Sequence, residues 1–214
     1  MTDITEPAQQ LSDLARQYGM SITDSQAVQL ADYCQRVWAW NERLNLTRHT
    51  DLNLFVTRDL LDSVRLAEHL EPHARILDVG SGGGVPGIVV AILRPDLGVT
   101  LCDSVGKKAT ALQDIVNGMQ LNVTVLGQRV QDLLKEQRYG CVTVRAVGAL
   151  DKILPWFQPL WDYGAQALLI KGPRWKEELA EVQRSGKARG RRIERIASWG
   201  SPGRDGESVL LRIQ

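Results

Sequence analysis

The residues best suited to chemistry lie in a glycine-rich turn. The run Asp78–Gly87 follows an aliphatic segment typical of a strand and precedes a segment typical of a helix. Glycines such as Gly80 and Gly82 allow the backbone to turn sharply and allow a ligand to approach without an intervening Cβ atom. Because open α/β sheets bind ligands at the carboxyl ends of their strands, this turn is predicted to hold a cofactor.

Two acids narrow the kind of cofactor. Asp78 lies two residues before Gly80, and Asp103 ends the next predicted strand, where a carboxylate can accept both ribose hydroxyls of a nucleoside. A dinucleotide fingerprint would need its third glycine at Val85, and a phosphate-binding loop would need a Lys-Ser or Lys-Thr pair. S-adenosylmethionine fits, since it has a ribose and an adenine but no pyrophosphate, and Asp78 is expected to attract its amino-acid end. The alternative is that both acids only stabilise turns.

The first 71 residues are expected to be helical. Apolar residues recur at helical spacing on both sides of Gly19, which suits a helix end, and Thr23, which suits a helix start. A third helix is predicted over Asp51–His69. We therefore predict an N-terminal helical element over residues 1–71.

After Pro72, short aliphatic runs alternate with helical stretches, which is typical of β-α-β units and a largely parallel sheet. The expected strands are Arg75–Val79, Gly98–Cys102, Asn122–Leu126, Cys141–Arg145 and Ala165–Ile170. The expected helices are Pro86–Leu93, Gly106–Met119, Val130–Glu136, Leu150–Trp161 and Trp175–Ser185. Two final runs, Arg192–Ala197 and Ser208–Ile213, have no helix between them and predict a hairpin. Residues 72–214 are thus expected to form an α/β, Rossmann-like domain with seven strands, the C-terminal one antiparallel.

Composition excludes several other classes of protein. The 214 residues are 43% hydrophobic and 24% charged, as in ordinary globular domains. No apolar run is long enough to span a membrane, and residues 1–10 lack the features of a signal peptide, so a cytoplasmic location is expected. Three cysteines without a C-x-x-C pair, and three histidines without ligand spacing, argue against disulfides and against a bound metal.

Five motifs together resemble a known family. They are Asp78–Gly87, Asp103–Lys108, Arg145-Ala146, Lys171-Gly172 and the N-terminal segment Trp40–Thr47. Their combination is similar to the small-subunit rRNA methyltransferase G family, also called glucose-inhibited division protein B, over nearly the whole chain. The resemblance implies a class I S-adenosylmethionine-dependent methyltransferase fold. It also implies a bacterial enzyme that methylates N7 of a guanine in the 530 loop of 16S rRNA.

The resemblance extends to single positions. Gly80 and Val85 match the glycine-loop positions, Val130 and Gln131 match the pair flanking the adenine, and Arg145 matches the arginine after the fourth strand. The complete cofactor-binding set that we predict is Asp78, Gly80, Ser81, Gly82, Val85, Asp103, Ser104, Val130, Gln131 and Arg145.

Three positions depart from the family pattern. Gln131 replaces the usual Glu, although a side-chain amide still forms hydrogen bonds. Gly140 stands where an aspartate usually begins the fourth strand, and Asp59 stands where the family often has His. These changes bear more on RNA contacts than on cofactor binding.

The expected reaction needs positioning more than acid–base catalysis. Guanine N7 carries a free lone pair, so no proton has to leave before it attacks the sulfonium methyl group. The Asp/Asn-Pro-Pro-aromatic loop of amino-group methyltransferases is absent after the fourth strand. Arg145 is the predicted catalytic residue, donating to guanine O6 or a phosphate or orienting the cofactor; the alternative is a structural ion pair. Cys141 is expected to be a packing residue and not a nucleophile.

Basic residues supply candidate phosphate contacts. The predicted RNA-binding residues are Arg58, Lys107, Lys108, Lys171 and Arg174, together with the basic run 184–195. The alternative for that run is a solvated, charged connection. Trp38 and Trp40 are expected to pack between the helical element and the main domain, with base stacking as the alternative.

Three competing functions remain compatible with the sequence. An NAD-dependent oxidoreductase is disfavoured by Asp78 and the missing third glycine, and a non-catalytic RNA-binding module by the intact glycine-rich turn. A methyltransferase acting on another RNA or a small molecule is the main alternative, because a fold alone does not choose a substrate. The expected partner is 16S rRNA or the small subunit during assembly, and a monomer is expected.

Overall fold

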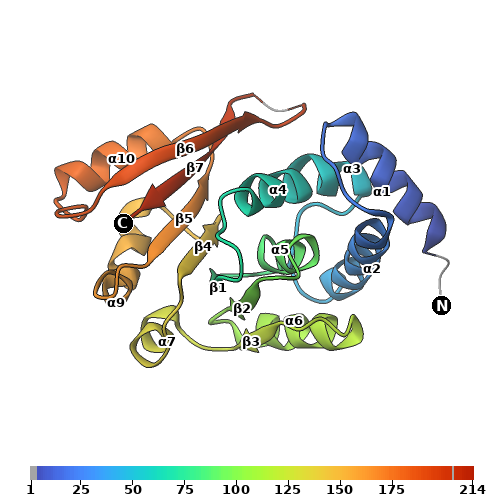
Figure 1. Cartoon of the computed structure of the whole chain (residues 1–214), viewed down its shortest axis with the longest axis horizontal. Helices are drawn as coiled ribbons and strands as arrows, with labels where there is room; N and C mark the ends of the chain where they lie inside the picture. Colours follow the sequence, from blue (N-terminus) through green and yellow to red (C-terminus); the bar gives the residue numbers. More distant parts are fainter. Residues whose placement is uncertain (1–3, 204) are drawn as a thin grey trace.

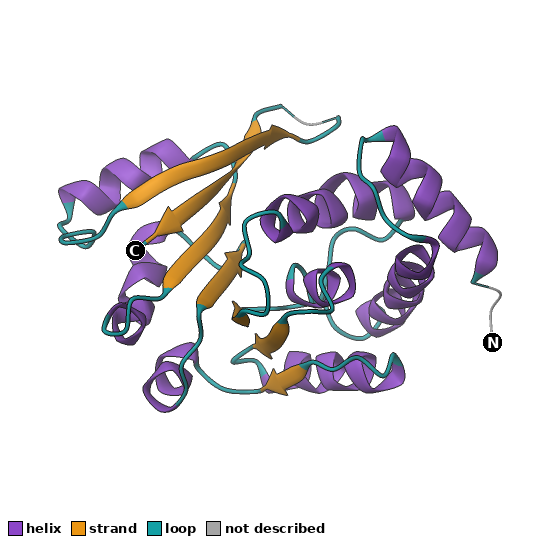
Figure 2. Cartoon of the chain, viewed as in Figure 1, coloured by secondary structure: helices purple, strands orange, loops and turns teal. Residues whose placement is uncertain are grey.

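Seven strands of the described chain form one central sheet in the order β3-β2-β1-β4-β5-β7-β6 (Figures 1 and 2). The computed structural model describes residues 4–203 and 205–214. The strands are β1 (Arg75–Val79), β2 (Gly98–Cys102), β3 (Thr124–Leu126), β4 (Cys141–Arg145), β5 (Gln166–Lys171), β6 (Ile193–Gly200) and β7 (Glu207–Ile213). The first five pair in parallel, whereas β7 is antiparallel to both β5 and β6. The predicted mostly parallel sheet with an antiparallel C-terminal strand is confirmed.

The strand order reverses beside β1, and this reversal leaves a crevice at the carboxyl ends of β1 and β4. β1 lies between β2 and β4, so the chain leaves β1 toward one side of the sheet and leaves β4 toward the other. The register aligns Val79 with Cys102 on β2 and with Val144 on β4, so that the carboxyl ends of all three strands are level. Ligands of open α/β sheets bind at such a switch point.

The helices after each strand match the predicted ones within a few residues, with one exception. They are α5 (Gly87–Leu93), α6 (Gly106–Gly118), α7 (Val130–Glu136), α8 (Leu150–Ile153), η2 (Leu154–Phe157), α9 (Gln158–Trp161) and α10 (Trp175–Arg184). The single helix expected over Leu150–Trp161 was wrong, because the stretch contains a 3₁₀ turn between two short helices. Pro155 and Pro159 explain the break, since each removes a backbone donor and crowds the preceding turn.

The N-terminal helices share a hydrophobic core with one face of the sheet. They are α1 (Thr5–Gln17), α2 (Asp24–Asn41), α3 (Leu52–Leu54), η1 (Phe55–Leu60, a π-helical turn) and α4 (Leu61–Ala67). Their buried residues join α5, α6 and alternate sheet residues such as Leu168 in one cluster, whereas α7, α9 and α10 cover the opposite face (Figure 1). The division of the chain after residue 71 stays a prediction.

Local signals account for the ends of these N-terminal helices. Thr23 accepts a hydrogen bond from the backbone N–H of Gln26, whose side chain accepts from the backbone of Thr23 in return, so α2 begins with a capping box. Gly19 adopts a φ of +72° just after α1. Residues 1–3 and 204, which belong to the predicted helical element and the predicted hairpin, lie outside the described residues. The helices of the described residues are too short or too polar to span a lipid bilayer.

Candidate functional site

The glycine-rich turn joins β1 to α5 and depends on glycine at particular positions. Gly80 and Gly84 have φ values of +68° and +108°, which L-residues with side chains rarely adopt. A Cβ atom added to Gly80 would lie 2.5 Å from Cγ2 of Val147, in the segment after β4. The turn therefore approaches the segment after β4 closely, as the switch point requires.

Asp78 lies beneath the turn and is 1% exposed. Its carboxylate accepts hydrogen bonds from Oγ1 of Thr143 at 2.9 Å and from the backbone N–H of Gly87 at 3.3 Å. Burial raises the pKa of Asp78 to about 6, against the lowering effect of these hydrogen bonds. Asp78 thus ties the start of α5 to β4, and its predicted attraction for the amino-acid end of the cofactor stays a prediction.

Asp103 follows β2 and holds the turn from the other side. Its Oδ2 accepts from the backbone N–H of Gly82 at 3.0 Å, and its Oδ1 accepts from that of Val105 at 2.9 Å. An ionised carboxylate has about four lone-pair positions, so two such bonds leave acceptor capacity for ribose hydroxyls. Ser81 donates from Oγ to the backbone oxygen of Asp78 and thereby stabilises the same bend.

A first cavity, of about 270 Å³, opens at the carboxyl ends of β1 and β2. It brings together Gly80, Ser104, Val130 and Gln131, four of the residues predicted to bind the cofactor. The remaining lining residues are Val79, Cys102, Gln128, Arg129, Val147 and Trp156. Sequence reasoning missed Trp156 and Gln128, since neither belongs to a motif.

A second cavity, of about 460 Å³, meets the first at Gly80. The glycine-rich turn forms its floor, and Lys108, Arg145 and Ala146 line it from the main domain. The N-terminal region contributes Tyr33, Leu46, Thr47, Arg48, His49 and Asp59. Leu46 and Thr47 belong to the motif Trp40–Thr47 and Asp59 is one of the departures from the family pattern, but none of these N-terminal residues was predicted as a site residue.

Hydrogen bonds fix the N-terminal wall of the second cavity to the turn. Oδ1 of Asn41, at the end of α2, accepts from the backbone N–H groups of Leu46 and Thr47 at 2.8 and 2.9 Å. Tyr33 is buried and donates its hydroxyl to the backbone oxygen of Gly83 at 2.9 Å. The wall is therefore built on α2, and the turn is held from both sides.

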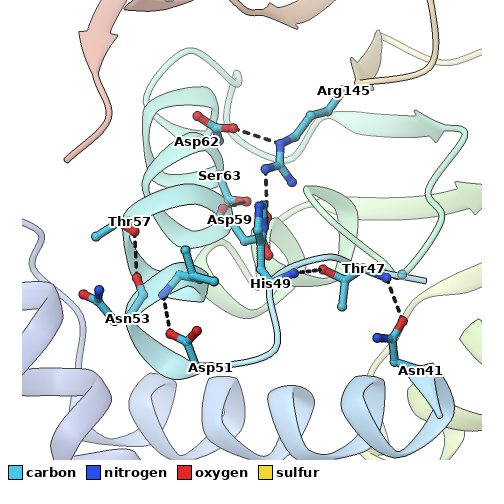
Figure 3. A network of polar contacts seen from close by, with 12 residues as sticks. Asn41, Thr47, His49, Asp51, Asn53, Thr57, Asp59, Asp62, Ser63 and Arg145 are labelled. Atoms are coloured by element: carbon cyan, nitrogen blue, oxygen red, sulfur yellow. Dashed lines mark hydrogen bonds and ion pairs between the residues drawn. The ribbon is translucent and has the colours of Figure 1, made fainter. Parts of the chain in front are cut away.

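Arg145 ends β4 and enters a buried ionic network (Figure 3). Its Nη2 lies 2.7 Å from Oδ1 of Asp59, and its Nε donates to Oδ2 of Asp62 at 2.8 Å. Asp62 also accepts from Nε1 of Trp199, on β6, at 2.9 Å. Nδ1 of His49 lies 2.9 Å from the same Oδ1 of Asp59. Arg145 thus forms structural ion pairs and also lines the second cavity, and its catalytic role stays a prediction.

Burial and ion pairing oppose each other in this network. Burial would lower the pKa of Arg145, but the carboxylates of Asp59 and Asp62 outweigh it, and the pKa is raised. Burial raises the pKa of Asp62, although Arg145 and Trp199 act in the opposite direction. The guanidinium therefore stays charged beside the cavity.

The predicted RNA-binding residues are placed differently from one another. Lys108 lines the second cavity, and its exposed neighbour Lys107 lies on the same first turn of α6. Lys171 is only 10% exposed and pairs with Glu178 at 2.6 Å, so its charge is compensated within the chain. Arg174 is exposed. Arg58 lies on η1, where its buried Nη1 has no hydrogen-bond partner among the described residues.

The basic run 184–195 lies near the amino-terminal ends of the parallel strands, whereas the cavities lie at their carboxyl ends. Ile193, within this run, pairs with Ile213, which pairs with Ala167 near the start of β5. The cavities lie at the other ends of the parallel strands. Four cations of the run pair with acids: Arg184 with Glu181, Lys187 with Asp151, Arg192 with Glu194 and Arg195 with Glu207. Its contact with phosphates stays a prediction.

Trp40 contacts the main domain, as expected, whereas Trp38 forms its hydrogen bond within the N-terminal region, and Cys141 is a buried packing residue. Nε1 of Trp40 donates to Oδ2 of Asp114 on α6 at 2.7 Å, and Nε1 of Trp38 donates to the backbone oxygen of His49 at 2.8 Å. Cys141 is 2% exposed, and burial raises the pKa of its thiol to about 12. A thiol with that pKa is protonated at neutral pH and is not a nucleophile.

A comparison with solved structures identifies the fold. A precorrin-6y C5,15-methyltransferase from Geobacter metallireducens superimposes with a TM-score of 0.54, covering 81% of this chain and 94% of that chain at 12% identity. At this identity the likeness shows the fold alone. The fold is that of class I S-adenosylmethionine-dependent methyltransferases.

The sequence comparisons define the family. Residues 26–205 match the family model described as rRNA small subunit methyltransferase G. Ribosomal RNA small subunit methyltransferase G from Rhodopirellula baltica is 43% identical over 183 residues, which cover 86% of this chain and 79% of that protein. Its counterpart from Escherichia fergusonii is 33% identical over 95% of this chain and 96% of that protein. The chain belongs to the rRNA small subunit methyltransferase G family.

The three departures from the family pattern occupy distinct places. Gln131 lines the first cavity, and Asp59 binds His49 and Arg145 in the ionic network. Gly140 donates its backbone N–H to the backbone oxygen of Arg75 at 2.9 Å, just before β4. Only Gly140 lies outside both cavities.

Proposed function

We propose that this protein transfers the methyl group of S-adenosylmethionine to N7 of a guanine in the 530 loop of 16S rRNA. The observation that carries the proposal is the meeting of two cavities at Gly80. One is lined by the residues expected to hold a nucleoside, and the other by a charged arginine. Family membership supports the choice of rRNA, because the fold is compatible with many substrates.

The first cavity fits the nucleoside half of the cofactor. The close approach of Gly80 to Val147 leaves no room for a side chain and brings the backbone to the cavity. Val130 and Gln131 would flank the adenine, and Asp103 would accept the ribose hydroxyls. When bound, S-adenosylmethionine supplies an electrophilic methyl group on a positively charged sulfur.

The second cavity fits the target base. Guanine N7 needs no general base, so the protein has to align the base and exclude competing geometries. Arg145 is held rigid by two carboxylates and would donate to O6, the acceptor next to N7 on the major-groove edge. Methylation moves positive charge onto the guanine, and the carboxylates of Asp59 and Asp62 would stabilise that charge.

The proposed partner is a polyanion that reaches the site over a basic rim. Lys107 and Lys108 would bind phosphates next to the flipped or single-stranded target base. As parts of this proposal, we infer a cytoplasmic location and action as a monomer.

The test is methylation of small-subunit rRNA in cells with and without the gene. N7-methylguanosine is read by N7-specific chemical cleavage, nucleotide by nucleotide. The proposal expects one guanine of the 530 loop to lose its methyl group when the gene is deleted and to regain it on complementation. An unchanged guanine would refute the rRNA assignment and leave the cofactor assignment standing.

A further inference from the structure

His49 is held against the second cavity by contacts on its backbone and its ring. Its backbone N–H donates to Oγ1 of Thr47 at 3.0 Å, and its backbone oxygen accepts from Nε1 of Trp38 at 2.8 Å. Its side chain lines the second cavity and is 27% exposed. The imidazole is therefore both positioned and accessible.

Asp59 fixes the orientation of the imidazole. Nδ1 of His49 lies 2.9 Å from Oδ1 of Asp59, a side chain only 5% exposed that is also paired with Arg145. An ionised carboxylate only accepts hydrogen bonds, so Nδ1 is the donor. In the neutral ring this leaves Nε2 as an acceptor. Within the part of the chain that the structure describes, Nε2 has no hydrogen-bond partner.

The carboxylate of Asp59 thus positions two side chains, His49 and Arg145, that can form hydrogen bonds with a base in the second cavity. His49 offers an acceptor. Arg145 offers donors, because its ion pairs use Nε and one proton of Nη2 out of five N–H groups. Guanine presents the complementary pair on adjacent atoms, the donor N1–H and the acceptor O6. Adenine presents an acceptor at N1 and an amino group at C6, so both contacts would be lost.

Resting on the proposed function, we propose that His49 determines base specificity by accepting a hydrogen bond from N1–H of the target guanine. Arg145 donates to O6 on the same base. N7 lies on the opposite side of O6 from N1 and would then face the junction of the two cavities at Gly80. Asp59 is a positioning residue, since it acts through His49 and Arg145.

The test compares two target bases in otherwise identical small subunits. One carries guanine at the methylated position, and the other carries 1-methylguanine, which keeps N7 and O6 but replaces N1–H with a methyl group. The proteins are the wild type, His49→Ala and His49→Gln, whose amide oxygen lies near the place of Nε2. His73→Ala is the matched control, because His73 is exposed and lies outside both cavities. The readouts are kcat/KM on each base and the Kd for S-adenosylmethionine.

Wild type is expected to prefer guanine strongly. His49→Ala should lose about 10- to 100-fold in kcat/KM on guanine, the cost of one unmade hydrogen bond in a buried site. The same variant should accept 1-methylguanine better than wild type does, because it removes the opposing ring. His49→Gln should keep most of the preference for guanine over 1-methylguanine, and His73→Ala should keep all of it. No variant should change the Kd for S-adenosylmethionine.

Several outcomes would overturn the inference. Equal wild-type rates on both bases would show that N1–H is not read, and an unchanged guanine preference in His49→Ala would show that His49 does not read it. A loss in His49→Gln as large as in His49→Ala would assign the effect to packing. If the wild type methylates no guanine at all, the proposed function fails and this inference fails with it.

Discussion

The two cavities that meet at Gly80 are built in different ways. The first is lined mainly by residues at or just after the ends of β1, β2, β3 and β4, together with Trp156 on η2. The second takes much of its wall from residues 33–59, which precede the sheet in the chain. The half proposed to bind the cofactor is thus built at the carboxyl ends of the sheet strands, whereas the half proposed to bind the base is assembled from two distant parts of the sequence. The first half can therefore be recognised from the segments that follow the strands, whereas the second depends on how the N-terminal region packs against the turn.

The largest expected effect is on the base-binding half. Replacing Arg145 by Ala removes the donor proposed for guanine O6 and leaves Asp59 and Asp62 without their cation. We expect methylation to fall by at least about 10²-fold. We also expect the free energy of unfolding to fall by about 3–5 kcal/mol, because two buried carboxylates lose their partner. Single-turnover methylation and urea denaturation measure the two effects separately.

The matched control for the stability of Arg145→Ala is Arg174→Ala, at an exposed site outside both cavities. Its stability should match that of the wild type within about 0.5 kcal/mol. Near-normal turnover by folded Arg145→Ala would remove the residue from the chemistry and leave only its structural ion pairs.

The junction of the two halves is tested at Gly80. Gly80→Ala combines a positive φ with a Cβ atom 2.5 Å from Val147, whereas Gly164→Ala has a similar φ of +72° and nothing within 4 Å. The strain of φ alone costs about 1–2 kcal/mol in both variants. Only Gly80→Ala should also weaken binding of S-adenosylmethionine, which calorimetry measures directly. Equal affinities of the two variants would contradict the placement of the cofactor at this turn.

Beneath the cofactor half, Asp78 predicts an unusual pH dependence of stability. Its folded-state pKa of about 6 lies above the ordinary value of 3.8, so the folded protein binds the proton more tightly than the unfolded chain. This group therefore makes the free energy of unfolding rise as the pH falls from about 6 to about 4, by up to about 3 kcal/mol. Asp78→Asn should remove that rise, and urea denaturation at several pH values would detect it. A wild-type stability that falls steadily over this window with the same slope as Asp78→Asn would contradict the assignment.

The smallest expected effect concerns single lysines and arginines that could contact RNA phosphates. Lys108 lines the second cavity, whereas Arg192 lies near the amino-terminal ends of the parallel strands and is paired with Glu194. Removing Lys108 should reduce the salt dependence of small-subunit binding by about one phosphate contact, and removing Arg192 should change it little. Affinities measured over a range of salt concentrations give both slopes. A larger change in the Arg192 variant than in the Lys108 variant would place the RNA near the basic run 184–195.

The sequence predicted the cofactor half better than the base-binding half. Strand limits such as Cys141–Arg145, the glycine-rich turn and Asp103 follow from local composition and spacing, and the structure places them together. Tyr33 and His49 could not be assigned in this way, because their role depends on how α2 and the following segment pack against the turn. Trp156 was missed for the same reason.

The partners of charged residues were the hardest feature to predict from the sequence. Lys171 is one of the motif residues expected to bind RNA, yet its partner Glu178 lies seven positions away on α10, and only the fold shows that the two meet. Asp59 looked like a departure from the family pattern, and its contacts with His49 and Arg145 depend on η1 facing the end of β4. By contrast, the break in the helix predicted over Leu150–Trp161 could have been predicted from Pro155 and Pro159, since proline disfavours a continuous helix.

The central claim is that the turn at Gly80 holds a sulfonium nucleoside and not a dinucleotide. Titration calorimetry of the purified protein with S-adenosylmethionine, and separately with NADH, tests it most directly. We predict saturable binding of one equivalent of S-adenosylmethionine and no binding of NADH. Absence of S-adenosylmethionine binding by the folded protein, or saturable binding of NADH in its place, would contradict this assignment.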